Sequence, residues 1–185
     1  MPERKQYGNI IAISGEGRNV GKTVLACNII GKFSRYINIV GIKITPHSHK
    51  DIGKAERINS ANGFQLYRET DPRGPKDTSR MLAAGATEAY LIQLSGDEQL
   101  KEALEVMEKL SGPRVIYVCE SGILPSREQV GISLFVRQIN CNSCSDEKKL
   151  PDSDVDRIVT CTLNHFDMDL NDIILQEDTW KLKKS

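Results

Sequence analysis

The chain has few aromatic residues and no excess of charge of either sign. Aromatic side chains make up 5% of its 185 residues, with a single tryptophan, Trp180, so the core must be largely aliphatic. Lysine plus arginine and aspartate plus glutamate both number 25, which gives a formal net charge of zero. A protein that binds nucleic acid or a membrane surface non-specifically needs a basic excess. The balance therefore predicts neither partner, although it is compatible with a local basic site.

The sequence also lacks a long hydrophobic run and an even set of cysteines. No apolar stretch approaches the ~20 residues needed to span a bilayer. Residues 1–7 are polar and charged, and the short apolar stretch after them ends in glycines, which is not typical of a signal peptide. With five cysteines and no export signal, reduced thiols or metal ligands are expected rather than structural disulfides. We therefore expect a cytoplasmic protein.

Strand and helix patterns alternate along the chain. Residues 9–14 form a short run rich in β-branched side chains, which is typical of a strand buried on both faces. Apolar side chains recur at helical spacing over 22–34, and 37–44 predicts a second buried strand, so this part is a βαβ unit. We expect a three-layer α/β domain with a mostly parallel sheet over residues 1–185. Further strands are predicted at 64–68, 89–94, 114–119, 132–136 and 157–163, and helices at 78–84, 97–110 and beyond Asp169.

The loop between the first strand and the first helix carries the main motif. Residues 14–23 read Ser-Gly-Glu-Gly-Arg-Asn-Val-Gly-Lys-Thr. The phosphate-binding pattern G-x-x-x-x-G-K-[ST] requires glycine at position 16, where this chain has Glu16. Gly15 lies one place earlier, so the loop is one residue longer. The end of the motif, Gly21-Lys22-Thr23, is intact, and the strand before it and helix after it are the context the motif requires.

These residue types suit a nucleoside triphosphate with Mg²⁺. Glycines let backbone N–H groups approach phosphate oxygens, and a helix N-terminus adds a partial positive charge. Lys22 is suited to bridging the terminal phosphates and the Thr23 hydroxyl to binding Mg²⁺. The alternative is an ordinary glycine-rich turn. The predicted nucleotide contacts are Gly15, Glu16, Gly17, Arg18, Asn19, Val20, Gly21, Lys22, Thr23 and Val24.

An acid that completes such a magnesium site is expected at the end of another buried strand. Glu120 follows the apolar run 115–119 and precedes a turn of small residues. Ligands of an α/β sheet gather at the carboxyl ends of its strands, so Glu120 is predicted to share an edge with the phosphate loop. The alternative is a solvated acid at a strand end.

The extended loop resembles the P-loop NTPases related to dethiobiotin synthetase. A closer resemblance, over most of the first 125 residues, is to the molybdopterin-guanine dinucleotide biosynthesis protein B family. Three stretches carry it: the phosphate loop, residues 40–49 (Val-Gly-Ile-Lys-Ile-Thr-Pro-His-Ser-His) and residues 76–86 (Lys-Asp-Thr-Ser-Arg-Met-Leu-Ala-Ala-Gly-Ala). Residues 118–122 stand where the family has a strand ending in glutamate.

The resemblance implies a single P-loop nucleotide-binding domain that binds GTP and assists a molybdopterin guanylyltransferase, with homodimerisation as a further expectation. It implies phosphate and Mg²⁺ contacts for Lys22 and Thr23, and metal assistance from Glu120. It also implies that Lys43, His47 and Asp77 line the active face. Lys22, Glu120 and Lys43 are thus the candidate catalytic residues, although Lys43 is equally interpreted as a surface lysine.

Other constellations keep alternatives open. His47 and His49 are interpreted either as ligands or as solvated loop histidines. Cys141 and Cys144 have the spacing of zinc ligands, which Cys161 and His165 or a second subunit would complete; otherwise they lie in a plain polar loop. Asn164-His165-Phe166-Asp167 is similar to the Asn-Lys-x-Asp segment with which many GTPases read guanine, with histidine replacing lysine. On that interpretation Asn164 and Asp167 contact the base, and GTP is preferred over ATP.

The sequence is compatible with three functions. The first is a GTP-binding accessory protein of molybdenum-cofactor biosynthesis, with slow GTP hydrolysis if any. The second is an ATP-dependent small-molecule ligase or kinase of the dethiobiotin-synthetase type, in which Lys43 holds the attacking group. The third is a nucleotide-switched metal-delivery protein that uses Cys141 and Cys144.

Overall fold

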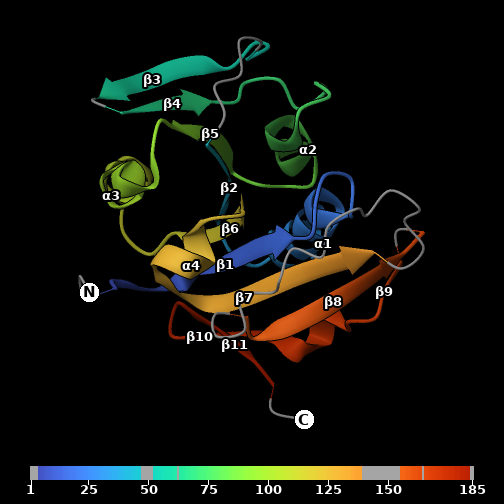
Figure 1. Cartoon of the computed structure of the whole chain (residues 1–185). Helices are drawn as coiled ribbons and strands as arrows, with labels where there is room; N and C mark the ends of the chain where they lie inside the picture. The colour runs from blue at the N-terminus through green and yellow to red at the C-terminus, as the bar shows by residue number, and fades with distance from the viewer. Residues whose placement is uncertain (1–3, 47–51, 62, 139–154, 164, 184–185) are drawn as a thin grey trace.

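The computed structural model describes residues 4–46, 52–61, 63–138, 155–163 and 165–183, in which strands and helices alternate (Figure 1). The strands are β1 (Gln6–Gly15), β2 (Ile39–Thr45), β3 (Glu56–Ala61), β4 (Phe64–Arg68), β5 (Glu88–Leu94), β6 (Ile116–Ser121), β7 (Gln129–Gln138), β8 (Arg157–Thr162), β9 (His165–Phe166), β10 (Ile173–Gln176) and β11 (Thr179–Leu182). The helices are α1 (Lys22–Phe33), α2 (Asp77–Ala83), α3 (Leu100–Ser111) and α4 (Leu124–Arg127), with 3₁₀ turns η1 (Asp97–Gln99) and η2 (Leu170–Asp172).

Nine of these strands form one sheet, in the order β3-β4-β5-β2-β6-β1-β7-β8-β9. The central strands β5, β2, β6, β1, β7 and β8 run parallel, and β3, β4 and β9 pair antiparallel at the two edges. The predicted α/β fold with a mostly parallel central sheet is confirmed. The chain from β1 through α1 to β2 skips one position, because β6 lies between these two strands.

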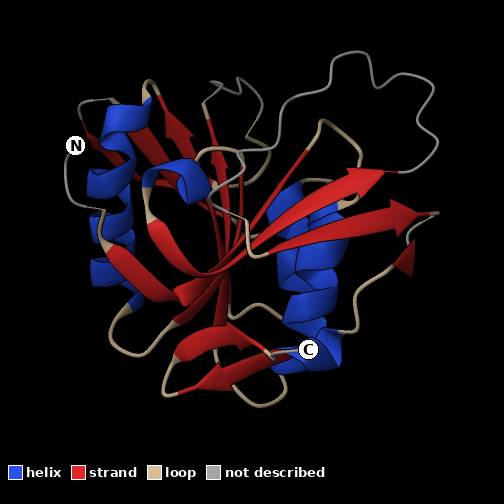
Figure 2. Ribbon diagram, turned by 60° about the horizontal axis from the view of Figure 1, so that its bottom comes forward, coloured by secondary structure: helices blue, strands red, loops and turns tan. Residues whose placement is uncertain are grey.

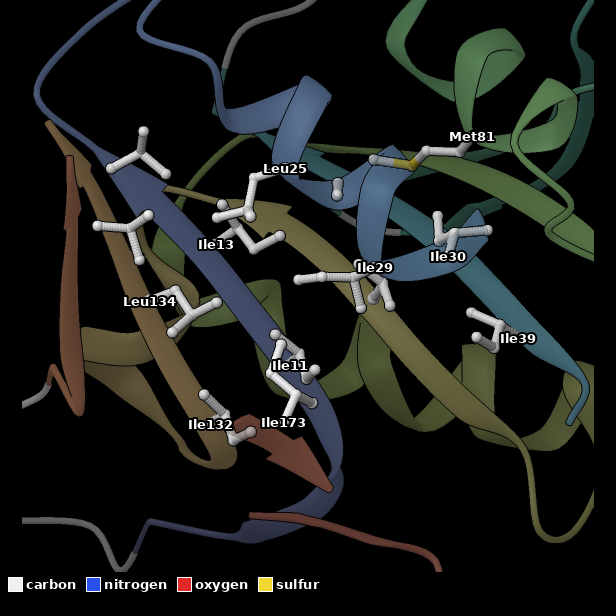
Figure 3. Packing of buried hydrophobic residues seen from close by; sticks show 14 of the residues in the cluster. Ile11, Ile13, Leu25, Ile29, Ile30, Ile39, Met81, Ile132, Leu134 and Ile173 are labelled. Carbon is white, nitrogen blue, oxygen red and sulfur yellow. The ribbon is translucent and has the colours of Figure 1, made fainter. Parts of the chain in front are cut away.

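Helices cover both faces of the sheet (Figure 2). A separate hydrophobic core lies under each set of helices. On one face, α1 and α2 pack on alternate residues of β1, β2, β6 and β7; Figure 3 shows Leu25 and Ile29 of α1 against Ile11 and Ile13 of β1. On the other face, α3 and α4 pack on the intervening residues of the same sheet. Since successive side chains of a strand point to opposite faces, β1, β2, β5 and β6 contribute to both cores.

The segment beyond Asp169 is not the helix that the sequence predicted. It forms the short turn η2 and then the two-stranded hairpin β10–β11. The hairpin turn has Glu177 at φ 51° and Asp178 at φ 58°, a left-handed pair that usually favours Asn-Gly. The fully buried Trp180 then packs edge-to-face on Phe33 of α1, with ring centroids 5.0 Å apart.

Two other expectations need correction. The region between β2 and α2 contains an antiparallel hairpin, β3–β4, where the sequence predicted only the strand at 64–68. The helix predicted over residues 97–110 is instead the 3₁₀ turn η1 followed by α3, and Leu110 near the end of α3 is 46% exposed. Within the described residues, no helix has both the length and the apolar character needed to cross a membrane.

Candidate functional site

The loop between β1 and α1 is held by close backbone approaches. Asn19 (φ 62°) and Gly21 (φ 102°) are both in the left-handed region. A Cβ atom on Gly21 would lie 2.8 Å from the Cys161 sulfur, and one on Gly15 would lie 2.6 Å from the Val136 carbonyl oxygen. The close contacts therefore leave no room for a side chain at either position, and the left-handed φ also favours glycine at Gly21.

Glu16, the residue that departs from the strict motif, ties the loop to β7. Its backbone N–H donates to the Val136 carbonyl at 3.2 Å, and its carboxylate pairs with Arg137 at 2.9 Å. Lys22 folds back over the loop, and its ammonium donates to the Gly17 carbonyl. The extra residue is thus part of a loop anchored at both ends, rather than an open insertion.

Glu120 lies beside the loop, at the carboxyl end of the sheet. In the register of the parallel strands it is level with Ile13 of β1 and Lys43 of β2. Its side chain is 4% exposed. It accepts a hydrogen bond from the Thr23 hydroxyl at 2.6 Å and forms an ion pair with the Lys43 ammonium. Asp77, the first residue of α2, completes the group: its carboxylate lies 2.9 Å from the Thr23 hydroxyl, whose single proton serves one of the two acids at a time, and Lys43 pairs with it at 3.1 Å.

The charges of this group stabilise one another. Burial by itself raises the pKa of Asp77, but the Lys43 ammonium and the Thr23 hydroxyl outweigh it and bring the pKa below its ordinary value. Burial by itself lowers the pKa of Lys43, but the Glu120 and Asp77 carboxylates more than offset it and raise the pKa. Both residues are therefore charged over the whole neutral range.

These residues line a cavity of about 490 Å³, which lies within the ~300–1,000 Å³ of typical ligand pockets. Four cationic side chains face two carboxylates along its wall, so the cavity has an excess of positive charge suited to a polyanion. We call it the loop cavity. Its lining residues are Arg18, Asn19, Gly21, Lys22, Thr23, Val24, Lys43, Thr45, Asp77, Arg80 and Glu120.

Comparison with protein-family models, curated proteins and solved structures gave no match. The family resemblance therefore stays a proposal that rests on the motifs.

Nine of the residues that the sequence predicted for the site line the loop cavity. Of the predicted nucleotide contacts, Arg18, Asn19, Gly21, Lys22, Thr23 and Val24 line it, together with the predicted Lys43, Asp77 and Glu120. Gly15, Glu16, Gly17 and Val20 belong to the same loop but do not line the cavity, and the Val20 side chain is buried in the core.

The remaining predicted residues fall elsewhere. Asp167 does not line the loop cavity; its carboxylate accepts from the Thr160 backbone N–H at 2.7 Å and closes the β8–β9 turn. Cys161 is buried and His165 exposed, and no group of three or more metal-ligating side chains occurs among the residues that the structure describes. The predictions for His47, His49, Cys141, Cys144 and Asn164 lie outside the described residues.

Arg80, Thr45 and Arg137 are site residues that the sequence did not single out. Arg80 follows Asp77 by three residues on α2, so helical spacing from that predicted acid would have found it. Thr45 ends β2, at the strand edge already assigned to ligands. Arg137 had no local signal, because its role depends on β7 lying next to β1.

Hard oxygen donors in this group suit a magnesium ion. The Thr23 hydroxyl and the Glu120 and Asp77 carboxylates converge within hydrogen-bond distance, and Mg²⁺ is usually held by one or two carboxylates plus phosphate oxygens and water. In the structure the Lys43 ammonium provides the positive charge between the two carboxylates. The donor set thus fits Mg²⁺ brought in together with a polyphosphate.

Proposed function

We propose that this protein binds a nucleoside triphosphate with Mg²⁺ in the loop cavity, as a P-loop protein. The observation that carries the proposal is the pairing of Thr23 with both Glu120 and Asp77, directly after Lys22 at the start of α1. A phosphate loop needs a hydroxyl and a second acid at the metal and a lysine at the terminal phosphates. All three lie in one positively charged cavity.

The chain's own residues have distinct roles in this proposal. The backbone N–H groups at the start of α1 and the Lys22 ammonium bind phosphate oxygens and offset their charge. Thr23 and Glu120 would hold the metal ion, which would neutralise the phosphates and orient them. Lys43 lines the same cavity, where its ammonium would be available to the terminal phosphate.

For the biological role, we propose a GTP-binding accessory protein of molybdenum-cofactor biosynthesis. Support comes from the three motif stretches of the sequence, two of which supply Lys43 and Asp77 to the same cavity as the phosphate loop. Hydrolysis of GTP is expected to be slow, since no described residue of the cavity is an evident water-positioning group. A guanylyltransferase partner and a homodimer belong to the same proposal.

The first test is equilibrium titration with fluorescent GTP and ATP analogues, with and without Mg²⁺. Loss of the Lys22 ammonium removes charge-assisted hydrogen bonds worth about 1.5–3 kcal/mol, so Lys22→Ala should weaken binding by about 10–100-fold. Lys32→Ala is the matched control, because Lys32 is on the last turn of the same helix and bonds Asn171.

Tight, Mg²⁺-dependent binding that prefers GTP and is lost only in Lys22→Ala would support the proposal. Absence of binding to either nucleotide by a folded protein would refute it. Equal binding by wild type and Lys22→Ala would show that the phosphate loop has been misinterpreted.

An ATP-dependent small-molecule enzyme is the second candidate, and one observation favours it. A second cavity adjoins the loop cavity and shares Lys43 and Asp77 with it. A preference for ATP, with phosphate released only when a small molecule is added, would favour this candidate.

A further inference from the structure

Glu16 stands where the strict phosphate-binding motif has a glycine, and its side chain makes a contact outside the loop cavity. Its carboxylate pairs with the Nε atom of Arg137 at 2.9 Å, and its backbone N–H donates to the Val136 carbonyl at 3.2 Å. One residue of the phosphate loop is therefore bound to β7 through both its backbone and its side chain.

The two ends of the phosphate loop rest on neighbouring strands, because β7 lies between β1 and β8. At the entry end, Gly15 is level with Val136 of β7, and Glu16 follows with its two bonds to that strand. At the exit end, Gly21 lies so close to β8 that a Cβ atom on it would be 2.8 Å from the Cys161 sulfur. The exit end is thus held by close packing, and the entry end by a backbone hydrogen bond and an ion pair.

The ion pair is well placed to act on the shape of the loop rather than on a ligand. Neither Glu16 nor Arg137 lines the loop cavity. The Arg137 side chain is 42% exposed and that of Glu16 is 25% exposed, so both charges lie toward solvent. If each charge acted directly on a polyanion, the acid would repel it and the arginine attract it. As partners that hold the loop, the two residues have the same effect.

We propose that Glu16 and Arg137 are positioning residues of the nucleotide site, whose ion pair holds the entry end of the phosphate loop on β7 in the shape that receives the phosphates. The inference rests on the proposed function. A loop that already has its binding shape gives a higher affinity than one that has this shape for a fraction of the time. Loss of the pair lowers that fraction, so the nucleotide binds less tightly although no contact with it is removed.

The test is titration with fluorescent GTP and ATP analogues in Mg²⁺, on wild type, Glu16→Gln, Arg137→Gln and the double variant. An ion pair of this exposure is worth enough to make binding about two- to fivefold weaker in each single variant. The double variant should bind no more weakly than either single variant, because the same pair is lost in all three.

The double variant also separates position from charge, since it has the same net charge as wild type. A direct effect of charge predicts that Glu16→Gln strengthens binding, that Arg137→Gln weakens it, and that the double variant matches wild type. The swapped pair, Glu16→Arg with Arg137→Glu, should recover affinity that the double variant lacks, because it restores the attraction between the two positions.

Arg127→Gln is the matched control. Arg127 pairs with Asp97 at 2.7 Å, where the two side chains are 57% and 35% exposed, and neither residue lines the loop cavity. In urea unfolding, Arg127→Gln and Arg137→Gln should lose similarly small amounts of stability. Only Arg137→Gln should lose affinity for the nucleotide.

Wild-type affinity in both single variants would overturn this inference and leave the proposed function standing. Opposite effects of the two single variants would also overturn it, since they would show a direct effect of charge. An equal loss of affinity in Arg127→Gln would show general destabilisation instead of positioning. Absence of nucleotide binding by the folded wild type would overturn both the inference and the proposed function.

Discussion

Replacing Lys43 by methionine should destabilise the protein, and Mg²⁺ should reverse much of the loss. Methionine keeps the length of the side chain but removes the charge that lies between Glu120 and Asp77. The Glu120 side chain is 4% exposed, whereas that of Asp77 is 36% exposed. Removing one partner of a buried ion pair costs about 3–5 kcal/mol, and an exposed pair contributes about 0–1 kcal/mol.

Because one carboxylate is buried and the other is partly solvated, we expect a loss of about 2 kcal/mol in the absence of metal. For a chain of this size, that lowers the melting temperature by about 4–8 °C. Mg²⁺ supplies the missing charge, so it should stabilise Lys43→Met more than wild type through preferential binding to the folded state. Thermal and urea unfolding, in EDTA and in excess MgCl₂, measure both effects.

The pH dependence follows from the directions of the two pKa shifts. The lowered pKa of Asp77 gives stability that is present above its ordinary value of 3.8 and is lost as the pH falls below it. The raised pKa of Lys43 gives stability that is present below its ordinary value of 10.5 and is lost as the pH rises above it. The difference between wild type and Lys43→Met should therefore be constant near neutrality and shrink at both extremes.

Lys5→Met is the matched control, because Lys5 pairs with Glu108 where both side chains are 38% exposed. It should cost less than about 1 kcal/mol, and Mg²⁺ should not change that cost. A Lys43→Met protein as stable as wild type in EDTA, or one destabilised equally with and without Mg²⁺, would refute the reasoning about this group.

Two further predictions concern the loop and Glu69, which lines the second cavity. Gly21→Ala should lower the free energy of unfolding in urea by about 1–3 kcal/mol. The reason is that alanine there combines a left-handed φ of 102° with a Cβ atom 2.8 Å from the Cys161 sulfur. Gly17→Ala, which meets open space, should unfold like wild type; equal losses would contradict the steric argument. Glu69→Gln should lower the free energy of unfolding by about 1–3 kcal/mol at pH 7, because the glutamine amide nitrogen cannot accept hydrogen bonds from the donors around it. Burial by itself raises the pKa of Glu69, but those hydrogen bonds outweigh it and lower the pKa. The difference in stability between wild type and Glu69→Gln should therefore shrink as the pH falls below 4.5. A difference that persists in acid, or an equal loss in the exposed control Glu102→Gln, would be inconsistent with this role.

The sequence predicted the elements with strong local patterns. The β1–loop–α1 unit carries a β-branched run, glycines and a helical stripe within about 30 residues, so it needed no tertiary information. The C-terminal hairpin has strands of four residues, and its left-handed turn is made by Glu177 and Asp178 rather than by glycine or asparagine. Its stability comes from packing Trp180 under α1, which no window of the sequence reveals.

In the candidate site too, local patterns predicted single residues, whereas the contacts between them depend on the tertiary fold. Lys22 and Thr23 were predicted from their spacing, and Glu120 from its place after a buried strand. What spacing could not predict is that Thr23, Lys43, Asp77 and Glu120 form one hydrogen-bonded group, because that depends on β6 lying between β1 and β2 and on α2 starting beside Lys43.

That arrangement also explains how the two carboxylates can lie so close together. Two carboxylates that converge on one hydroxyl would repel each other, and burial of Glu120 would make the repulsion costly. Lys43 offsets this because its ammonium reaches both acids from the neighbouring strand. The geometry that suits Mg²⁺ is therefore preformed around a cation of the chain itself. In the proposed function, the Lys43 ammonium would lie beside the metal ion and the phosphates, at the boundary between the two cavities that it lines.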